Sequence, residues 1–159
     1  MTHITTLTPA DIDDLAALRQ ALWPRHGVAA HRTDIVEALA SGKDLALIAR
    51  DSHGRAVGFA EASIRHDYVN GCDTAPVAFL EGIYVDPDCR RTGLGAIGLL
   101  HRFGLARRLV DAVEAWARQQ GYRELASDAP IDNSASHAMH DALGFKETQR
   151  VVFFRKGLG

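Results

Sequence analysis

Three strand-like segments follow one another in the middle of this chain without a helical segment between them, and this order constrains the fold most. Residues 45–49 and 57–64 are apolar runs, and the turn residues at 51–54 between them predict a β-hairpin. A polar stretch then leads to a third strand at 77–85. A fold with this order must contain a sheet of at least these strands.

Helical segments lie on both sides of this region. Thr8 followed by Pro9 is typical of a helix start, and Trp23-Pro24 should end that first helix. We expect further helices at 34–40, 109–117 and 134–143, and further strands at 4–7, 124–127 and 148–154. The mixture predicts an α/β fold with a mixed sheet, and no linker divides the 159 residues into two domains.

Composition excludes several classes of protein. The 18 Lys and Arg against 20 Asp and Glu give a formal charge of −2, whereas a nucleic-acid binder would carry a basic surplus. No apolar run is long enough for a membrane span, so we expect no membrane partner. The N-terminus lacks the pattern of a signal peptide, and the two cysteines form no disulfide framework. These features predict a cytoplasmic protein.

A glycine-rich segment lies between a strand and a helix, where backbone N–H groups and a helix N-terminus can bind an anion. It runs from Val85 to Gly95 and contains Arg90 and Arg91, which would add contacts to phosphate. A glycine-rich turn with solvated arginines has the same composition. Glycine spacing alone does not decide between the two interpretations.

The glycine motif occurs twice, 11 residues apart, as Arg91-Thr-Gly-Leu-Gly95 and Arg102-Phe-Gly-Leu-Ala106. If Gly93–Gly95 binds the phosphates, the next helix gains about three turns and carries internal glycines. If Gly104–Ala106 binds them, an ordinary crossover helix reaches to Gly121. We favour the second geometry.

Several motifs together resemble the aminoglycoside 6′-N-acetyltransferases of the GNAT acetyltransferase superfamily. They are the stretch Phe59–Asp73, the segments 79–85 and 125–128, the glycine motif, and Ala142-Leu-Gly-Phe-Lys-Glu-Thr148. The resemblance covers nearly the whole chain, residues 1–159, as one GNAT domain. Residues 91–101 depart from it as an insertion.

The resemblance implies a GNAT fold, a mixed central sheet that splays between two parallel strands and is flanked by helices. It implies transfer of an acetyl group from acetyl-CoA to the 6′-amine of an aminoglycoside, without a covalent enzyme intermediate. Acetylation of another amine, such as a polyamine, an amino sugar or a peptide N-terminus, is the alternative enzyme. A non-catalytic acyl-CoA-binding module is the third hypothesis.

The resemblance also assigns cofactor contacts. Ile83, Tyr84 and Val85 would pair with the pantetheine arm as an added strand, and Asn133 would lie near that arm. The residues expected at the pyrophosphate are Arg91, Arg102, Gly104 and Ala106. No metal is expected, since His137 and His140 lack an evident third ligand.

Two carboxylates are the candidate catalytic and substrate-binding groups. Glu81 interrupts an apolar strand, so it either binds the substrate ammonium and accepts its proton or pairs with an arginine. Asp128 follows the next strand, where it either faces the ligand crevice or caps a turn. Together they would attract a polycation. Gln149 is a departure from the family resemblance, which implies a third acid at about this position.

The remaining candidates are aromatic rings and an imidazole. Trp23, His26 and Tyr68 would contact the sugar rings, although Trp23 and Tyr68 also fit simple packing roles. His140 would protonate the departing thiolate, where many superfamily members carry a tyrosine, unless it is an ordinary helix histidine. The apolar end at 151–154 would leave an exposed edge, so we expect a homodimer.

Overall fold

A computed structural model describes residues 2–90 and 104–159 of the chain. Five strands form one sheet in the order β1-β2-β3-β4-β5, and only the β4–β5 pair is parallel. The strands are β1 (His3–Thr6), β2 (Leu45–Arg50), β3 (Ala56–Arg65), β4 (Val77–Val85) and β5 (Leu125–Ser127). The predicted mixed sheet is therefore confirmed.

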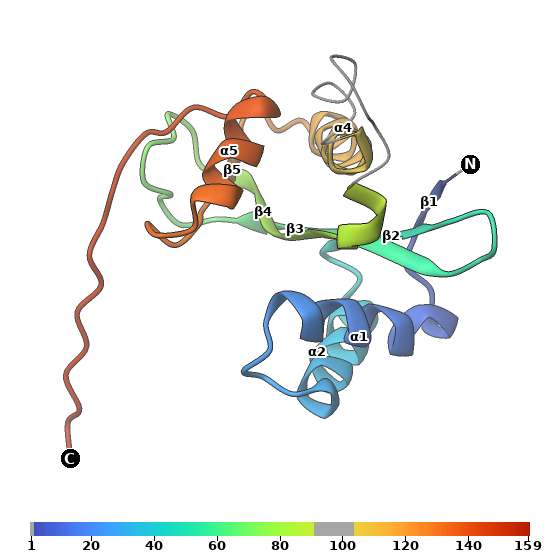
Figure 1. The fold of residues 1–159 in the computed structure, drawn as a ribbon. Coiled ribbons are helices and arrows are strands. Elements are labelled where there is room, and N and C mark those ends of the chain that lie inside the picture. The colour runs from blue at the N-terminus through green and yellow to red at the C-terminus, as the bar shows by residue number, and fades with distance from the viewer. Residues whose placement is uncertain (1, 91–103) are drawn as a thin grey trace.

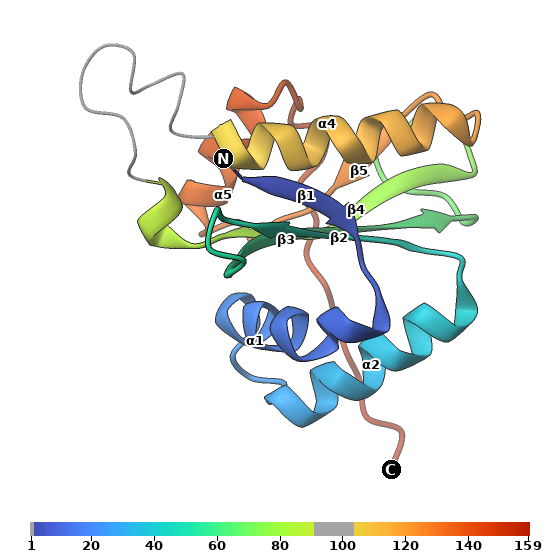
Figure 2. The ribbon, with the colours of Figure 1, turned by 90° about the vertical axis from the view of Figure 1, so that its right-hand side faces the viewer.

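Helices cover both faces of this sheet, as Figures 1 and 2 show. The helices α1 and α2 pack on one face, and α4 and α5 lie on the other. Their bounds are α1 (Ile12–Leu22), α2 (Val28–Ser41), α4 (Gly104–Gln119) and α5 (Ser134–Ala142), with short 3-10 helices at η1 (Pro9–Asp11) and η2 (Pro87–Arg90). Among the described residues, no helix is long and apolar enough to cross a membrane.

The sheet divides the core into two apolar layers. Phe59 of β3 packs with Leu15 and Ile35 on the α1–α2 side, and all three side chains are almost fully buried. On the opposite side, Leu80 of β4 packs with Leu109 of α4. Burial of such large side chains contributes about 1.5–3 kcal/mol each to folding, so both helical layers are held firmly to the sheet.

A β-bulge in β4 positions Glu81, one of the two candidate carboxylates. Glu61 of β3 pairs with Gly82, whereas the next residue, Ala62, pairs with Leu80. Glu81 is therefore the extra residue of the bulge, which bends the strand and redirects its side chain. The parallel register of β4 with β5 also ends at Leu80, opposite Ser127, while β4 continues to Val85. The two parallel strands thus separate at Glu81.

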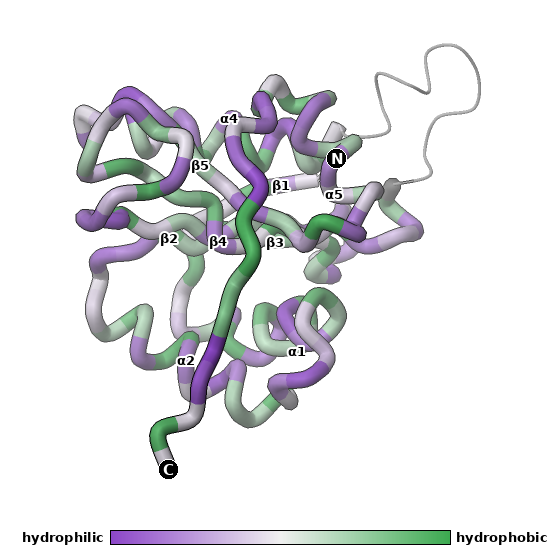
Figure 3. The backbone as a smooth tube through the Cα atoms, turned by 90° about the vertical axis from the view of Figure 1, so that its left-hand side faces the viewer, coloured by the Kyte–Doolittle hydropathy of each residue, from purple (hydrophilic) through white to green (hydrophobic). Residues whose placement is uncertain are grey.

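Most sequence-based boundaries agree with the structure to within two residues, with three exceptions. The helix expected at 109–117 begins five residues earlier, at Gly104. The second helix begins at Val28 rather than at residue 34, directly after Gly27, whose φ of 80° is one that glycine adopts readily. The predicted strand at 148–154 is wrong for the single chain. That segment forms an exposed tail without secondary structure (Figure 3), because it has no neighbouring strand to supply hydrogen bonds. The expected insertion at 91–101 lies outside the described residues.

Candidate active site

Glu81 is exposed at the bulge and accepts three hydrogen bonds. Its Oε1 accepts from Ser63 Oγ at 2.5 Å and from Arg65 Nε at 3.1 Å, and its Oε2 accepts from Arg65 Nη2 at 2.8 Å. Arg65 itself lies over the ring of Phe79, 3.3 Å from its centroid. Glu81 therefore pairs with an arginine, as one of the two alternatives expected, and it also lines a cavity. Its binding of a substrate ammonium stays a prediction.

That cavity has a volume of about 520 Å³ and lies between the sheet and the α1–α2 layer. Glu81 lines it together with Trp23 and His26, both of which were predicted to contact substrate. Asp34 and Asp44, two carboxylates that the sequence analysis did not single out, line it as well. A cavity with four acidic residues in its wall, Glu61 included, favours a cationic ligand.

Trp23 lies at the C-terminal end of α1 with its indole directly on the backbone of β4. A Cβ placed on Gly82 would come within 2.5 and 2.7 Å of two indole carbons. The ring of Trp23 also makes an edge contact with Phe59, 6.1 Å between centroids, and a tilted contact with His31. Trp23 therefore combines the predicted packing role with a place in the cavity wall.

A largely buried ion pair forms part of the cavity wall. Arg19 of α1 donates to both oxygens of Glu61, with Nε 2.8 Å from Oε2, and the two side chains are only 13% and 10% exposed. Burial raises the pKa of Glu61 even though hydrogen bonds from Arg19 lower it. The pair connects α1 to β3 and so holds the helix that carries Trp23.

Tyr68 projects from the loop between β3 and β4 and is 67% exposed, so it does not line the cavity in this structure. Glu124, just before β5, secures the same loop. Its carboxylate accepts hydrogen bonds from the backbone N–H of Asp73 at 3.0 Å and of Thr74 at 2.7 Å. The Thr74 hydroxyl also donates to it, and these bonds lower the pKa of Glu124.

Asp128 and His140 lie at the C-terminal end of β5, and neither lines the cavity that Glu81 lines. Asp128 is exposed immediately after β5. His140 of α5 is half-buried, with Nδ1 2.8 Å from the Ser136 carbonyl oxygen and Nε2 2.9 Å from Ser127 Oγ. Its ring also makes an edge contact with Phe145 at 5.1 Å between centroids. These hydrogen bonds orient the imidazole toward the C-terminal end of β5. The predicted proton transfer from His140 to a departing thiolate would require this orientation.

The predicted cofactor residues that the structure describes come from the end of β4 and from the starts of α4 and α5. Ile83, Tyr84 and Val85 form the part of β4 beyond its register with β5, while Gly104 begins α4 and Ala106 is buried against the core. Arg91 and Arg102 lie outside the described residues, as does Gly93–Gly95. The choice between the two glycine motifs thus stays a prediction.

Asn133 has a structural role, while its predicted contact with the cofactor stays a prediction. Its side-chain oxygen accepts a hydrogen bond from the Ser136 N–H at 3.1 Å and so caps α5. Such a cap contributes about 1 kcal/mol to helix stability. The cap occupies the oxygen, which leaves the amide N–H₂ as the group that would face a cofactor.

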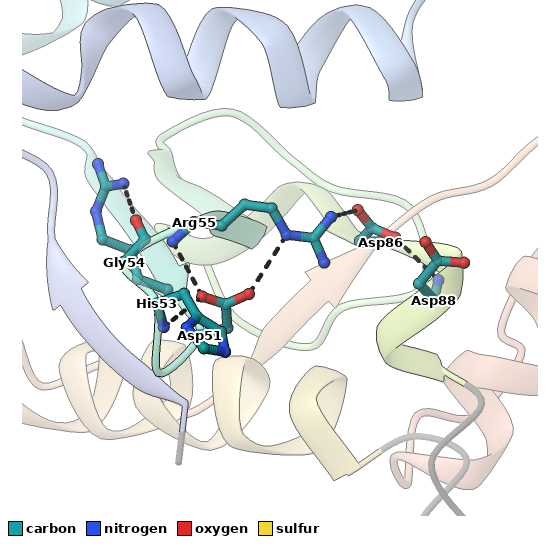
Figure 4. A network of polar contacts seen from close by, with 7 residues as sticks. Asp51, His53, Gly54, Arg55, Asp86 and Asp88 are labelled. Atoms are coloured by element: carbon teal, nitrogen blue, oxygen red, sulfur yellow. Dashed lines mark hydrogen bonds and ion pairs between the residues drawn. The ribbon is translucent and has the colours of Figure 1, made fainter.

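A polar network holds the exit of β4 in place (Figure 4). Arg55 in the β2–β3 hairpin donates to Asp51 and to Asp86, both at 3.3 Å. Asp86 in turn accepts the Asp88 N–H at 2.9 Å at the start of η2. The network fixes where the chain leaves β4 toward the glycine-rich segment.

Within residues 2–90 and 104–159, no three His, Cys, Asp or Glu side chains gather as a metal site would require. Four residues that hold site residues in place were not expected from the sequence: Arg19, Glu61, Glu124 and Ser127. Glu61 offered one signal, because it interrupts an apolar strand as Glu81 does. The others have ordinary sequence surroundings.

Comparisons with known proteins agree with this geometry. The chain is 49% identical to an aminoglycoside N(6′)-acetyltransferase type 1 of Serratia marcescens over 94% of each protein, and 49% identical to one of Acinetobacter genomosp. 13 over 99% of each. The crystal structure of AAC(6′)-Ih from Acinetobacter baumannii matches over the full length of both chains, with 43% identity and a TM-score of 0.87. AAC(6′)-Iy in complex with the bisubstrate analogue CoA-S-monomethyl-acetylneamine matches over 99% of each chain, with 43% identity and a TM-score of 0.85. The model of the acetyltransferase (GNAT) family matches residues 12–101 and 100–145, and the chain belongs to that family.

Proposed function

We propose that this protein is an aminoglycoside 6′-N-acetyltransferase that transfers acetyl directly from acetyl-CoA. The observation that carries the proposal is full-length similarity, at 43–49% identity, to proteins of that name. A cavity whose wall holds four carboxylates and one arginine supports it, since aminoglycosides are polycations. We treat residues 1–159 as one acetyltransferase domain.

In this proposal, Glu81 binds the ammonium that will be acetylated. Ser63 and Arg65 hold its carboxylate in one orientation with three hydrogen bonds, and one of the roughly four lone-pair sites, on Oε2, is left for the substrate. A carboxylate there also accepts the amine proton, directly or through water, and a neutral amine can then attack the thioester. Asp128 supplies a second negative charge across the splay.

Trp23 and His26 contact the apolar faces of the sugar rings from the cavity wall. Tyr68 contacts the sugar from the loop that Glu124 holds, provided that the loop moves inward on binding. Proximity of amine and thioester, rather than a covalent intermediate, then supplies most of the acceleration.

Acetyl-CoA fits the splay because β4 continues after its register with β5 has ended at Leu80. Ile83, Tyr84 and Val85 would bind the pantetheine arm as an extra strand, and Asn133 would contact it through its amide. Gly104 and Ala106, at the N-terminus of α4, would donate backbone N–H groups to the pyrophosphate, with Arg91 and Arg102 adding charge. His140 would supply the proton that the departing thiolate needs.

A substrate panel tests the function. Release of free CoA thiol is followed with kanamycin, tobramycin, spermidine, glucosamine and a peptide N-terminus, each over a range of concentrations. Aminoglycosides should give kcat/KM values at least 100-fold above the other amines. Equal turnover of simple amines would instead support a general amine acetyltransferase, and CoA binding without any thiol release would support a non-catalytic module.

We further propose that the protein is a homodimer joined through its C-terminal tail. Val152, Phe153 and Phe154 are 77%, 89% and 93% exposed in the single chain, which is costly for apolar side chains. An extended apolar tail can add to the sheet of a second copy. Light scattering should give twice the 17.3 kDa chain mass, and Phe153→Asp with Phe154→Asp should give the monomer mass.

We place the enzyme in the cytoplasm, where acetyl-CoA is formed. Its two cysteines, Cys72 and Cys89, are free thiols, and burial is the main cause that raises the pKa of each. Fractionation of cells that express the protein should recover transferase activity in the cytoplasmic fraction. Recovery in the periplasmic fraction would contradict the assignment.

A further inference from the structure

A chain of hydrogen bonds leads from α5 to the point where β4 and β5 separate. It starts at the Ser136 carbonyl, passes through the ring of His140, and reaches Oγ of Ser127 at 2.9 Å from Nε2. The same hydroxyl lies 3.3 Å from the carbonyl oxygen of Leu80. Because Leu80 and Ser127 are the last residues in the β4–β5 register, the chain ends at the apex of the opening.

The donors and acceptors restrict the protonation states of this chain. Nδ1 of His140 lies 2.8 Å from the Ser136 carbonyl oxygen and 3.3 Å from the Ser136 hydroxyl. The carbonyl oxygen, at the shorter distance, only accepts, so we assign a proton to Nδ1. When the imidazole of His140 is neutral, Nε2 is an acceptor and takes the single hydroxyl proton of Ser127. When the imidazole is protonated, Nε2 donates to Oγ, and the hydroxyl proton turns toward Leu80 or toward a ligand at the apex.

His140 therefore has protein partners at both ring nitrogens, and the Ser127 hydroxyl stands between its Nε2 and the opening. We infer that Ser127 is the group that protonates the departing sulfur, and that His140 acts through it. The inference rests on the proposed acetyl transfer, in which a CoA thiolate leaves between the splayed strands.

The step balances as two coupled proton transfers. As the C–S bond of the tetrahedral intermediate breaks, the Ser127 hydroxyl proton forms the S–H bond. Oγ takes the Nε2 proton of the imidazolium at the same time, and His140 is left neutral. The substrate ammonium loses two protons overall during acetylation. One of them replaces the proton that His140 gave up, and the other goes to solvent.

Steady-state kinetics with acetyl-CoA and kanamycin test the inference on the full-length protein. Ser127→Ala should lower kcat about 100-fold, which is the lower range for one general acid, with both KM values within about twofold of wild type. Ser127→Thr keeps the hydroxyl and should recover at least a tenth of the wild-type kcat. Ser134→Ala removes an exposed hydroxyl from the same helix as His140 and serves as the matched control, with unchanged kinetics.

A double variant tests whether the two residues act as one unit. Ser127→Ala combined with His140→Gln should be no slower than the slower single variant, because either change interrupts the same relay. If kcat of the double variant falls by the product of the two single-variant factors, the relay is overturned. A Ser127→Ala enzyme with wild-type kcat, or one in which only KM changes, would overturn it as well. A wild-type protein that acetylates no aminoglycoside would instead overturn the proposed function, so the two failures are distinguishable.

Discussion

Replacement of Gly82 by alanine tests how closely Trp23 is packed on β4. The added Cβ would lie 2.5 and 2.7 Å from two indole carbons and 3.5 Å from a methyl group of Leu22. Carbon atoms pack best at about 3.5–4.0 Å, so the ring must retreat by about 1 Å. Phe59 and His31 contact the same ring, which prevents an easy shift.

Overpacking of this kind typically costs 1–3 kcal/mol. For a chain of this length, 1 kcal/mol lowers Tm by about 2–4 °C, so Gly82→Ala should unfold about 2–12 °C earlier. Urea denaturation followed by circular dichroism measures the free energy of unfolding directly. Because the displaced ring lines the cavity, the KM for an aminoglycoside should rise as well.

Two further variants make the experiment specific. Gly157→Ala is the matched control, since a Cβ at Gly157 meets nothing within 4 Å and should leave stability unchanged. Trp23→Leu with Gly82→Ala should cost less than the sum of the single changes, because the smaller side chain removes the clash. Wild-type stability for Gly82→Ala, or strictly additive losses in the double variant, would refute this view of the contact.

Three other changes have definite expected outcomes. Glu81→Gln keeps the hydrogen bond from Ser63 but loses the charge, so kcat/KM for an aminoglycoside should fall about 10–100-fold, the equivalent of a charged hydrogen bond, in steady-state assays. Glu124→Gln weakens the hold on the loop that carries Tyr68, so hydrogen exchange at residues 66–76 should accelerate and KM should rise while Tm changes little. Hydrogen bonds from Thr8, and secondly from Arg50, lower the pKa of Asp11 below its ordinary value of 3.8. The ionised carboxylate therefore stabilises the folded state at pH values above 3.8, and this stabilisation is lost as the pH falls through the folded-state pKa. Asp11→Asn should therefore lower the free energy of unfolding by about 1 kcal/mol in urea denaturation at pH 7. At a pH low enough to protonate Asp11 in both the folded and the unfolded protein, the substitution should have no measurable effect.

The order of elements was predictable because it depends on local patterns. Apolar runs bounded by turn residues located β4 at its observed bounds and placed β2 and β3 within two residues. The same patterns wrongly predicted a strand at 148–154. β-Branched and aromatic residues show that a segment favours the strand conformation, but they do not show whether a neighbouring strand is present to pair with it. That neighbour is absent within the single described chain, and a second copy would have to supply it.

The supporting contacts of the site could not be predicted, because they join residues far apart in sequence. Arg19 and Glu61 are 42 positions apart, and Thr74 and Glu124 are 50 apart. A single sequence shows only that each residue is polar or charged. The reason for glycine at position 82 is likewise visible only when α1 has been placed against β4.

The bulge at Glu81 explains why this residue can pair with Arg65, line the cavity and mark the point where β4 and β5 separate. In a regular strand, an acid flanked by buried residues would face either the core or a neighbouring layer, and burial of its charge would cost several kcal/mol. The extra residue instead turns Glu81 outward beside a cavity, where Ser63 and Arg65 can reach it. The same irregularity coincides with the end of the β4–β5 register, which opens the sheet for a second, extended ligand. In the proposed reaction, this one local departure from sheet geometry would bring the cationic substrate and the acetyl donor together, with the hydroxyl of Ser127 at the edge of the same opening.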